Sequence, residues 1–173
     1  MVIKKRGQVW VETVTYTLIA FIMIGLILSF AKPKIEEAKH KSILEQSAQM
    51  LREIDTIIQN VGEESVGNKR KIEMELKEGS LEIKPSENLI IFEMNSRYLY
   101  SEPGEKVSEG PISIETVEKG KYNEVKMTLN YSGEYNITQG NSLNGKILSK
   151  APQPYSLYIS NKGGTPTKVD IEL

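Results

Sequence analysis

The sequence contains no cysteine, and only one of its 173 residues is a histidine. The absence of cysteine excludes disulfide bonds, thiolate metal sites and thiol nucleophiles together. Charge of one sign is not in excess, because 22 Lys and Arg residues stand against 23 Asp and Glu residues, giving a net charge of -1. No overall basic field is therefore present to recruit nucleic acid. The length predicts one globular domain with an appendage and excludes a large multidomain enzyme.

Sequence patterns that carry chemistry are also missing. The chain has no Gly-rich phosphate loop, no nucleophile elbow and no zinc-ligand spacing. Its one histidine, His40, stands between two lysines in a helical stretch, which predicts a solvated side chain. The neighbouring carboxylates Glu36-Glu37 and Glu63-Glu64 point apart on a helix, so they predict surface charge and no metal site. We therefore expect neither an enzyme nor a bound cofactor.

One long uncharged segment stands out in a chain that is otherwise rich in charge. Residues 13–31 carry no charged side chain, and about 20 apolar helical residues match a hydrocarbon core about 30 Å thick. Lys4, Lys5 and Arg6 precede the segment, which predicts a cytoplasmic N-terminus and an external C-terminal bulk. The residues after the segment lack the small side chains of a signal-peptidase site, so the segment is expected to stay in the mature protein. Hydropathy alone favours an ordinary signal anchor.

Glu12 departs from that simple anchor pattern. It stands at the start of the apolar run, where an unpaired carboxylate costs on the order of 1 to 3 kcal/mol, depending on depth. Glu12 either reaches back to headgroup water or has a partner. The string KRGQVWVE from Lys5 to Glu12, followed by the apolar run, resembles the class III signal of archaeal type IV pilins.

The resemblance implies a processing site formed by Lys5, Arg6, Gly7 and Gln8. A prepilin peptidase would cut between Gly7 and Gln8 and leave the apolar helix attached. Glycine suits this position because it has no side chain to collide with the protease or to favour a helix. Glu12 would become the fifth mature residue, where pilins carry a glutamate that meets the N-terminal amine of a neighbouring subunit. Gln8 replaces the usual phenylalanine, and its cyclisation would remove that amine.

The resemblance also implies partners and a location. Lipid surrounds the single-pass precursor, and the prepilin peptidase trims it. Other pilin subunits then take up the mature chain into an extracellular filament with the help of an assembly ATPase and its platform protein. Adhesion or a related surface role follows.

The helix is expected to continue beyond the membrane, over residues 8–61, with 8–31 in the membrane or filament core and 32–61 amphipathic. Pro33 predicts a kink and Gly62 a C-terminal stop. The predicted buried stripe comprises Ile43, Ser47, Ala48, Leu51, Ile54, Ile58 and Val61. Residues 1–7 form the predicted cytoplasmic leader.

Residues 62–173 change to the alternating pattern of strands, which predicts an extracellular, antiparallel β-rich head, a sheet or a small sandwich. The fold class is therefore α+β, and the resemblance implies a pilin-like layout. The first two strands, around residues 72–76 and 81–83, are expected to form a hairpin through Gly79-Ser80. Further expected strands are 89–94, 97–100, 112–117, 123–131, 155–160 and 168–173. Stretches 102–111 and 133–154 read as connections, and Gly163-Gly164 as a late hairpin turn.

Two sequons, Asn130-Tyr131-Ser132 and Asn136-Ile137-Thr138, can accept an N-linked glycan on an external domain. The predicted topology favours use at Asn136. Two other classes of protein also fit the anchor: a signal-anchored binding protein that does not polymerise, and a membrane-anchored hydrolase. The sequence leaves open a major or minor pilin role, and adhesion against secretion or DNA uptake.

Overall fold

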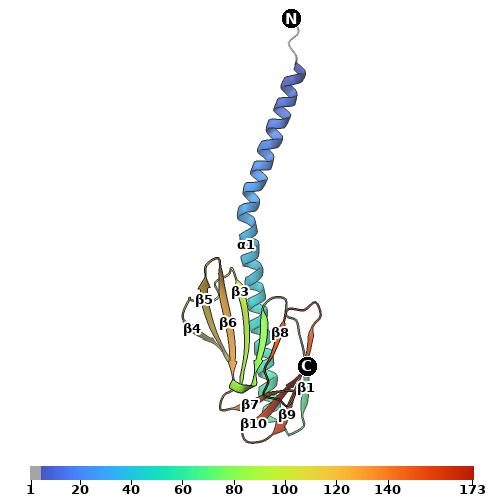
Figure 1. Cartoon of the computed structure of the whole chain (residues 1–173), viewed down its shortest axis with the longest axis vertical. Coiled ribbons are helices and arrows are strands. Elements are labelled where there is room, and N and C mark those ends of the chain that lie inside the picture. The colour runs from blue at the N-terminus through green and yellow to red at the C-terminus, as the bar shows by residue number, and fades with distance from the viewer. Residues whose placement is uncertain (1–4) are drawn as a thin grey trace. The chain divides into compact units, whose positions relative to one another are not determined.

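The computed structural model describes residues 5–173, with side chains from Val9 onward. Among these residues one long helix, α1 (Lys5–Glu63), is followed by ten strands and one short 3-10 helix, η1 (Pro85–Glu87) (Figure 1). The chain divides into two compact units, residues 1–38 and residues 39–173. We refer to the second unit as the head. Residue Lys4 of the predicted basic cluster, like the rest of residues 1–4, lies outside the described residues.

Helix α1 runs without interruption through Pro33 and ends at Glu63. The predicted stop at Gly62 is wrong, because this glycine lies inside the helix. Its role is steric: a β-carbon added to Gly62 would lie 2.2 Å from Cε1 of Tyr135. The left-handed glycine that follows the helix is Gly67, with φ of 95°.

The ten strands form two sheets. Sheet A has four strands in the order β1-β9-β10-β7, and sheet B has six in the order β4-β5-β6-β3-β2-β8. Their bounds are β1 Lys69–Met74, β2 Ser80–Lys84, β3 Leu89–Ser96, β4 Lys106–Glu109, β5 Ile112–Lys119, β6 Tyr122–Asn130, β7 Tyr135–Gln139, β8 Lys146–Ser149, β9 Tyr155–Gly163 and β10 Thr167–Glu172. Sheet B is antiparallel throughout, whereas sheet A is mixed because β7 and β10 run parallel. The α+β class is confirmed, and the expectation of purely antiparallel pairing is wrong.

The predicted hairpin through Gly79-Ser80 is also wrong. Strand β1 pairs with β9 in sheet A, and β2 pairs with β3 and β8 in sheet B. Alternation of apolar and polar residues marks a strand with one buried face and does not identify the strand beside it. The late hairpin is confirmed, since β9 and β10 pair antiparallel around Gly163 and Gly164.

Three short strands lie where connections were expected: β4 in the stretch 102–111, and β7 and β8 in the stretch 133–154. Conversely, the predicted strand at 97–100 is absent. Its first two backbone donors go to side chains: the Arg97 N–H donates to Nδ1 of His40 at 2.8 Å, and the Tyr98 N–H donates to Oγ of Ser96 at 2.9 Å. A segment whose N–H groups are satisfied in this way needs no ladder partner.

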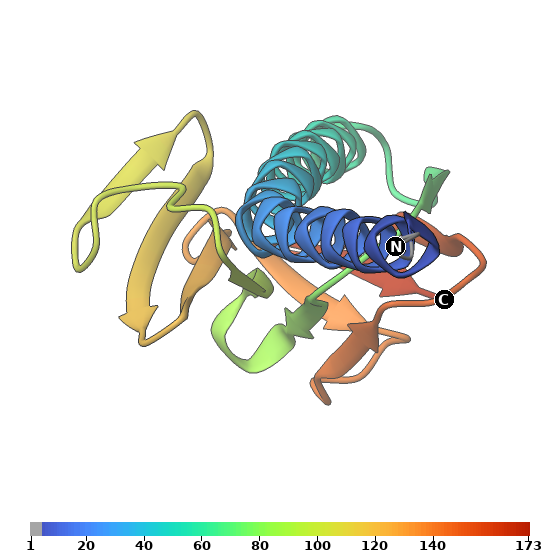
Figure 2. The ribbon, with the colours of Figure 1, turned by 90° about the horizontal axis from the view of Figure 1, so that it is seen from above.

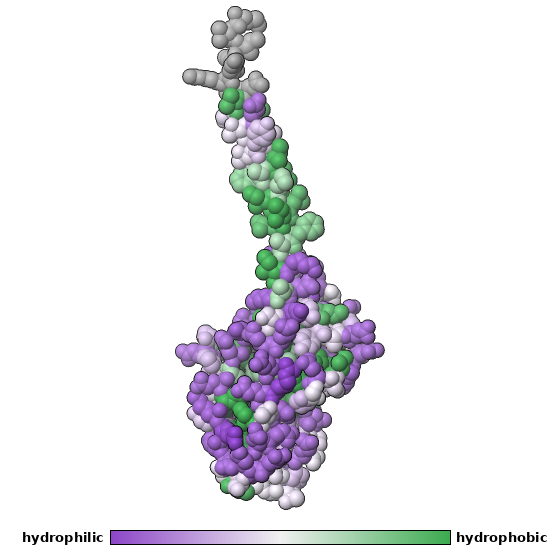
Figure 3. All heavy atoms as spheres, turned by 180° about the vertical axis from the view of Figure 1, so that it is seen from behind, coloured by the Kyte–Doolittle hydropathy of each residue, from purple (hydrophilic) through white to green (hydrophobic). Residues whose placement is uncertain are grey.

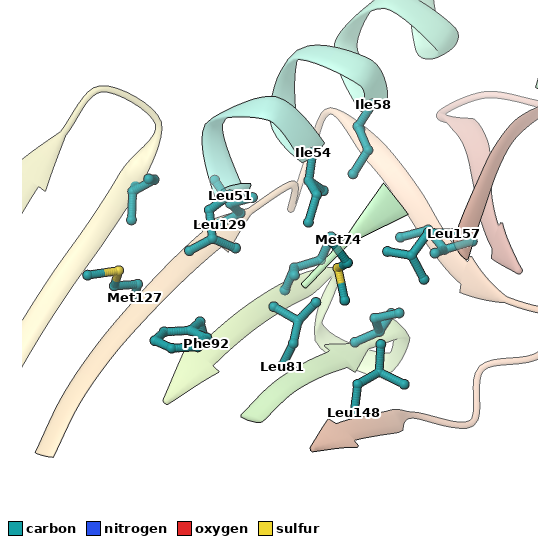
Figure 4. Packing of buried hydrophobic residues seen from close by; sticks show 14 of the residues in the cluster. Leu51, Ile54, Ile58, Met74, Leu81, Phe92, Met127, Leu129, Leu148 and Leu157 are labelled. Atoms are coloured by element: carbon teal, nitrogen blue, oxygen red, sulfur yellow. The ribbon is translucent and has the colours of Figure 1, made fainter. Parts of the chain in front are cut away.

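The core of the head lies between the second part of α1 and the strands. Leu51, Ile54 and Ile58 point from the helix toward side chains of the strands, including Phe92 and Leu129 (Figure 4). Seen from above, the strands curve around this part of the helix (Figure 2). The predicted stripe is confirmed, since all seven of its residues are buried. Leu44 and His40 are also buried and extend the same stripe to the beginning of the head.

Candidate membrane-spanning and assembly segment

The first part of α1 exposes its hydrophobic residues. Every residue from 9 to 30 is exposed, with Trp10, Tyr16 and Phe30 each at least 70% accessible. Hydrophobic residues gather on this segment, whereas the surface of the head is mainly hydrophilic (Figure 3). Among the described residues α1 is the one helix long and apolar enough to cross a membrane. Apolar exposure on this scale marks a membrane or interaction surface.

Three threonine hydroxyls at the start of this segment bond to the helix itself. Oγ1 atoms of Thr13, Thr15 and Thr17 donate to carbonyls four residues earlier, at 2.9, 2.8 and 2.8 Å. In hydrocarbon a hydroxyl without a partner is costly, so internal bonds make these residues compatible with a bilayer. The threonines therefore do not interrupt the membrane-compatible surface.

The residues of the predicted processing site belong to the first turns of α1. Lys5, Arg6, Gly7 and Gln8 have helical backbone, and their side chains lie outside the described part of the chain. Glu12 follows on the exposed helix and is the only charged residue between Arg6 and Lys32 in the sequence. The structure thus places all five predicted residues on one helical stretch, within two turns of each other.

The C-terminal end of α1 is fixed to the head by Asn161 of β9. The Nδ2 group of this buried residue donates to the carbonyls of Val61, Gly62 and Glu64, at 3.0, 3.3 and 2.9 Å. The last carbonyls of a helix lack partners within the helix, so a side-chain amide that bonds them acts as a cap. Asn161 also accepts at its Oδ1 from the Gly163 N–H at 2.7 Å. Nothing in the local sequence of α1 predicts this cap, because its residue lies 100 positions further along the chain.

Two tyrosines attach the side of the same helix. The hydroxyl of Tyr131 donates to Oδ1 of Asp55 at 3.0 Å, and that of Tyr135 donates to Oε1 of Gln59 at 3.0 Å. Burial raises the pKa of the Asp55 carboxyl, while the hydrogen bond from Tyr131 partly opposes this. Burial also raises the pKa of the Tyr131 hydroxyl above its usual value, and the Asp55 charge adds to the effect. Both phenols therefore act as neutral hydrogen-bond donors.

The expectation of a solvated His40 is wrong. Its side chain is buried and its Nδ1 accepts the Arg97 N–H, while Nε2 lies 3.5 Å from Oε2 of Glu78. Lys39 also pairs with Glu78, and this contact lowers the pKa of the Glu78 carboxyl. The flanking lysines suggested a wet face, but His40 continues the buried stripe three residues before Ile43, and that spacing was the available signal.

The two sequons differ in their surroundings. Asn130, at the end of β6, and Asn136, in β7, are both exposed. Ser132, the hydroxyl residue of the first sequon, is exposed, whereas Thr138 of the second is buried and donates to Oδ1 of Asp170 at 2.6 Å.

The described residues contain no group of three or more His, Asp or Glu side chains placed to hold a metal ion. Compared with known proteins, the chain matches no family model, no curated protein and no solved structure. Among the described residues, the features that bear on function are the exposed apolar segment and the attachment of the second part of α1 to the head.

Proposed function

We propose that the chain is the precursor of a structural subunit of an archaeal type IV pilus-like surface filament. The precursor sits in the membrane with its N-terminus inside and its head outside, and prepilin peptidase trims it between Gly7 and Gln8. The apolar part of α1 then leaves the lipid and packs among copies of itself, with adhesion or a related surface function carried by the heads. An assembly ATPase and its platform protein supply the work of extraction.

One observation carries the proposal: a single helix has two parts with opposite burial. Residues 9–30 are exposed and apolar, whereas the stripe from His40 to Val61 is buried in the core of the head. A simple membrane anchor needs only the first part. In a polymerising subunit the helix that packs among its copies also belongs to the fold of the head, and α1 supplies both parts.

The energetics favour an active assembly step. Moving an apolar helix from lipid into a bundle of similar helices gains little hydrophobic free energy, because lipid tails are as apolar as the side chains they replace. Specific contacts must then set the register, and Glu12 is the one charged group in the apolar stretch that can do so. This is the physical reason to assign Glu12 to assembly.

A signal-anchored extracellular binding protein that does not polymerise is the second candidate, and a membrane-anchored hydrolase is the third. The exposed apolar segment also fits both. The sequence shows no metal-ligand or nucleophile motif that would favour the hydrolase, and activity of the isolated head against model esters or peptides would support it.

N-terminal mass spectrometry of the chain isolated from its own cells tests the proposal directly. A mature N-terminus at Gln8, open or cyclised, is the expected result, in material that sediments as filaments after shearing. An intact Met1 in protein that stays in the membrane fraction would instead support the anchor. Gly7→Val, with Val9→Ala as a matched control, should block trimming, because a β-branched side chain is poorly accommodated where the protease needs a minimal one.

A further inference from the structure

We infer that Asn130, not Asn136, is the carbohydrate acceptor of the folded head, and that its glycan occupies a groove on the outer face of sheet B. The inference rests on the external location given by the proposed function. The two sequons differ in conformation, and a groove lies beside the first of them.

The first sequon is a turn. Oδ1 of Asn130 accepts the Ser132 N–H at 2.9 Å, so the side chain folds back over the two residues that follow. Ser132 is itself exposed, and its hydroxyl donates to the Glu87 carbonyl at 3.0 Å. No described residue bonds Nδ2 of Asn130, the atom that would receive the sugar. The asparagine and the serine of this sequon are thus both exposed at the surface.

The second sequon is held as a strand. Asn136 and Thr138 pair with Lys168 and Asp170 of β10, and residues i and i+2 of a strand lie about 6.6 Å apart. Thr138 is 4% accessible, and its hydroxyl donates to the carboxylate of the fully buried Asp170. A sequon needs its hydroxyl residue as well as its asparagine. In the folded head the hydroxyl residue of this sequon is buried.

A groove of about 350 Å³ lies beside Asn130. Along β6 the buried residues are Val125, Met127 and Leu129. Thr128 and Asn130 alternate with them and therefore face away from the core. Thr128 stands between Ile91 of β3 and Ser113 of β5 in the register of sheet B, and all three line the groove. Lys84, Glu115 and Lys126 line it as well.

The chemistry of this groove suits a sugar. Hydroxyl, ammonium and carboxylate groups can bond the hydroxyls of a saccharide, and the half-buried Leu89 side chain, which also lines the groove, offers an apolar surface to its C–H groups. The volume lies at the lower end of the range of small-ligand sites, which fits the first one or two sugars of a chain. Asn130 itself lines the groove, so a glycan attached there enters it without any linker.

The test uses the full chain, produced in a host that transfers glycans to N-x-Ser/Thr sequons of exported proteins. Peptide mass spectrometry should find the glycan on Asn130, with loss in Asn130→Gln and Ser132→Ala and no change in Asn136→Gln. Equal or greater occupancy of Asn136 overturns the assignment. A chain without glycan also overturns it, and protease treatment of intact cells then separates two failures. If the protease cleaves the head on intact cells, the head is external and only this inference fails. If the protease does not reach the head, the external location fails, and with it the proposed function.

The groove is tested by the rate at which an amidase releases the glycan. Release from the native chain should be several-fold slower than from the denatured chain. The matched control moves the sequon to the turn between β5 and β6, with Lys119→Asn and Lys121→Thr in the Asn130→Gln background, where native and denatured rates should agree. Equal rates for the Asn130 glycan in both states would overturn the groove assignment.

Discussion

The ring of Tyr135 packs directly on the backbone of Gly62, so closely that a β-carbon on this glycine would stand 2.2 Å from its Cε1 atom. The contact joins the last turn of α1 to β7, and the Tyr135 hydroxyl bonds Gln59 one turn earlier. Gly62 is therefore a packing position in the helix, even though glycine is a weak helix former.

Gly62→Ala is expected to destabilise the head by about 1 to 3 kcal/mol, because the buried ring must move and cannot keep its bond to Gln59. Urea denaturation of the fragment from Lys34 to Leu173 measures this. In a Tyr135→Ala background the same change should be neutral or stabilising by up to about 1 kcal/mol, from helix propensity alone. Equal destabilisation in both backgrounds would contradict the packing explanation.

Asn161→Asp tests the cap at the end of α1. The two side chains have the same shape, but aspartate lacks the Nδ2 donor and places a negative charge at the negative end of the helix dipole. We expect a loss of about 2 to 4 kcal/mol, since three carbonyls lose their partner at once. Lys168→Ala, at an exposed position of the neighbouring strand β10, serves as the control and should change stability little.

Asp55 predicts a pH dependence of stability whose sign is unusual for a carboxylate. Its pKa is raised by burial, so the folded head binds this proton more tightly than the unfolded chain. Stability from this group is present below the ordinary carboxyl pKa of about 3.9 and is lost as the pH rises through the raised folded value. Asp55→Asn keeps an acceptor for Tyr131 and removes the charge.

The asparagine variant should accordingly be at least as stable as the wild type at pH 7, with a gain below about 1 kcal/mol because Asp55 is only half-buried. The gain should shrink toward pH 3. Denaturation midpoints at several pH values give both curves, and Tyr131→Phe should steepen the wild-type dependence. Parallel curves for wild type and Asp55→Asn would refute the assignment.

His40 provides a test of a residue that was predicted to be solvated and is buried. His40→Leu removes the acceptor of the Arg97 N–H and should cost about 1 to 3 kcal/mol. His40→Asn should recover part of that loss, because its Oδ1 can stand near the position of Nδ1. Replacement of the exposed neighbour Ser42 by leucine should have little effect. If asparagine and leucine at position 40 are equally damaging, the hydrogen bond is not the source of stability.

These residues also show what the sequence could and could not predict. Helical spacing identified the buried stripe from Ile43 to Val61, because one face of a helix repeats every three to four residues whatever it packs against. Alternation found most strands for the same reason. The partner of each element was not predictable from the sequence. The pairing of β1 with β9, the parallel pairing of β7 with β10 and the cap formed by Asn161 all join residues far apart in sequence. Short strands such as β8 offer too few residues for an alternation to show.

The same distinction applies to the candidate site. The apolar run and the basic residues before it are local features that can be read directly from the sequence. Helix α1 contains the apolar run, and Lys5 and Arg6 lie in its first turn. The burial of Thr138 in the second sequon could not be predicted locally, because its hydroxyl bonds Asp170, 32 residues away. A three-residue motif carries no information about that carboxylate.

The last prediction concerns Glu12, for which two roles give opposite results. If Glu12 only anchors the helix at the membrane interface, Glu12→Gln should be harmless or should ease insertion, because it removes a charge that costs free energy in lipid. If Glu12 meets the N-terminal amine of an incoming subunit, the precursor should still insert and be trimmed at Gly7, but filament yield should fall sharply. An ion pair away from water is strengthened by the low dielectric, and removing one partner leaves the other charge buried at about 3 to 5 kcal/mol. Each added subunit would carry that penalty, which is enough to reduce the subunit affinity by a factor of more than about 100.

Quantifying trimmed monomer in membranes against protein in sheared filaments separates the steps, with Thr13→Ser as a control that leaves the charge in place. Normal filament yield from Glu12→Gln would defeat the pairing, and a fully cyclised Gln8 in wild-type filaments would reduce it from an ion pair to a hydrogen bond.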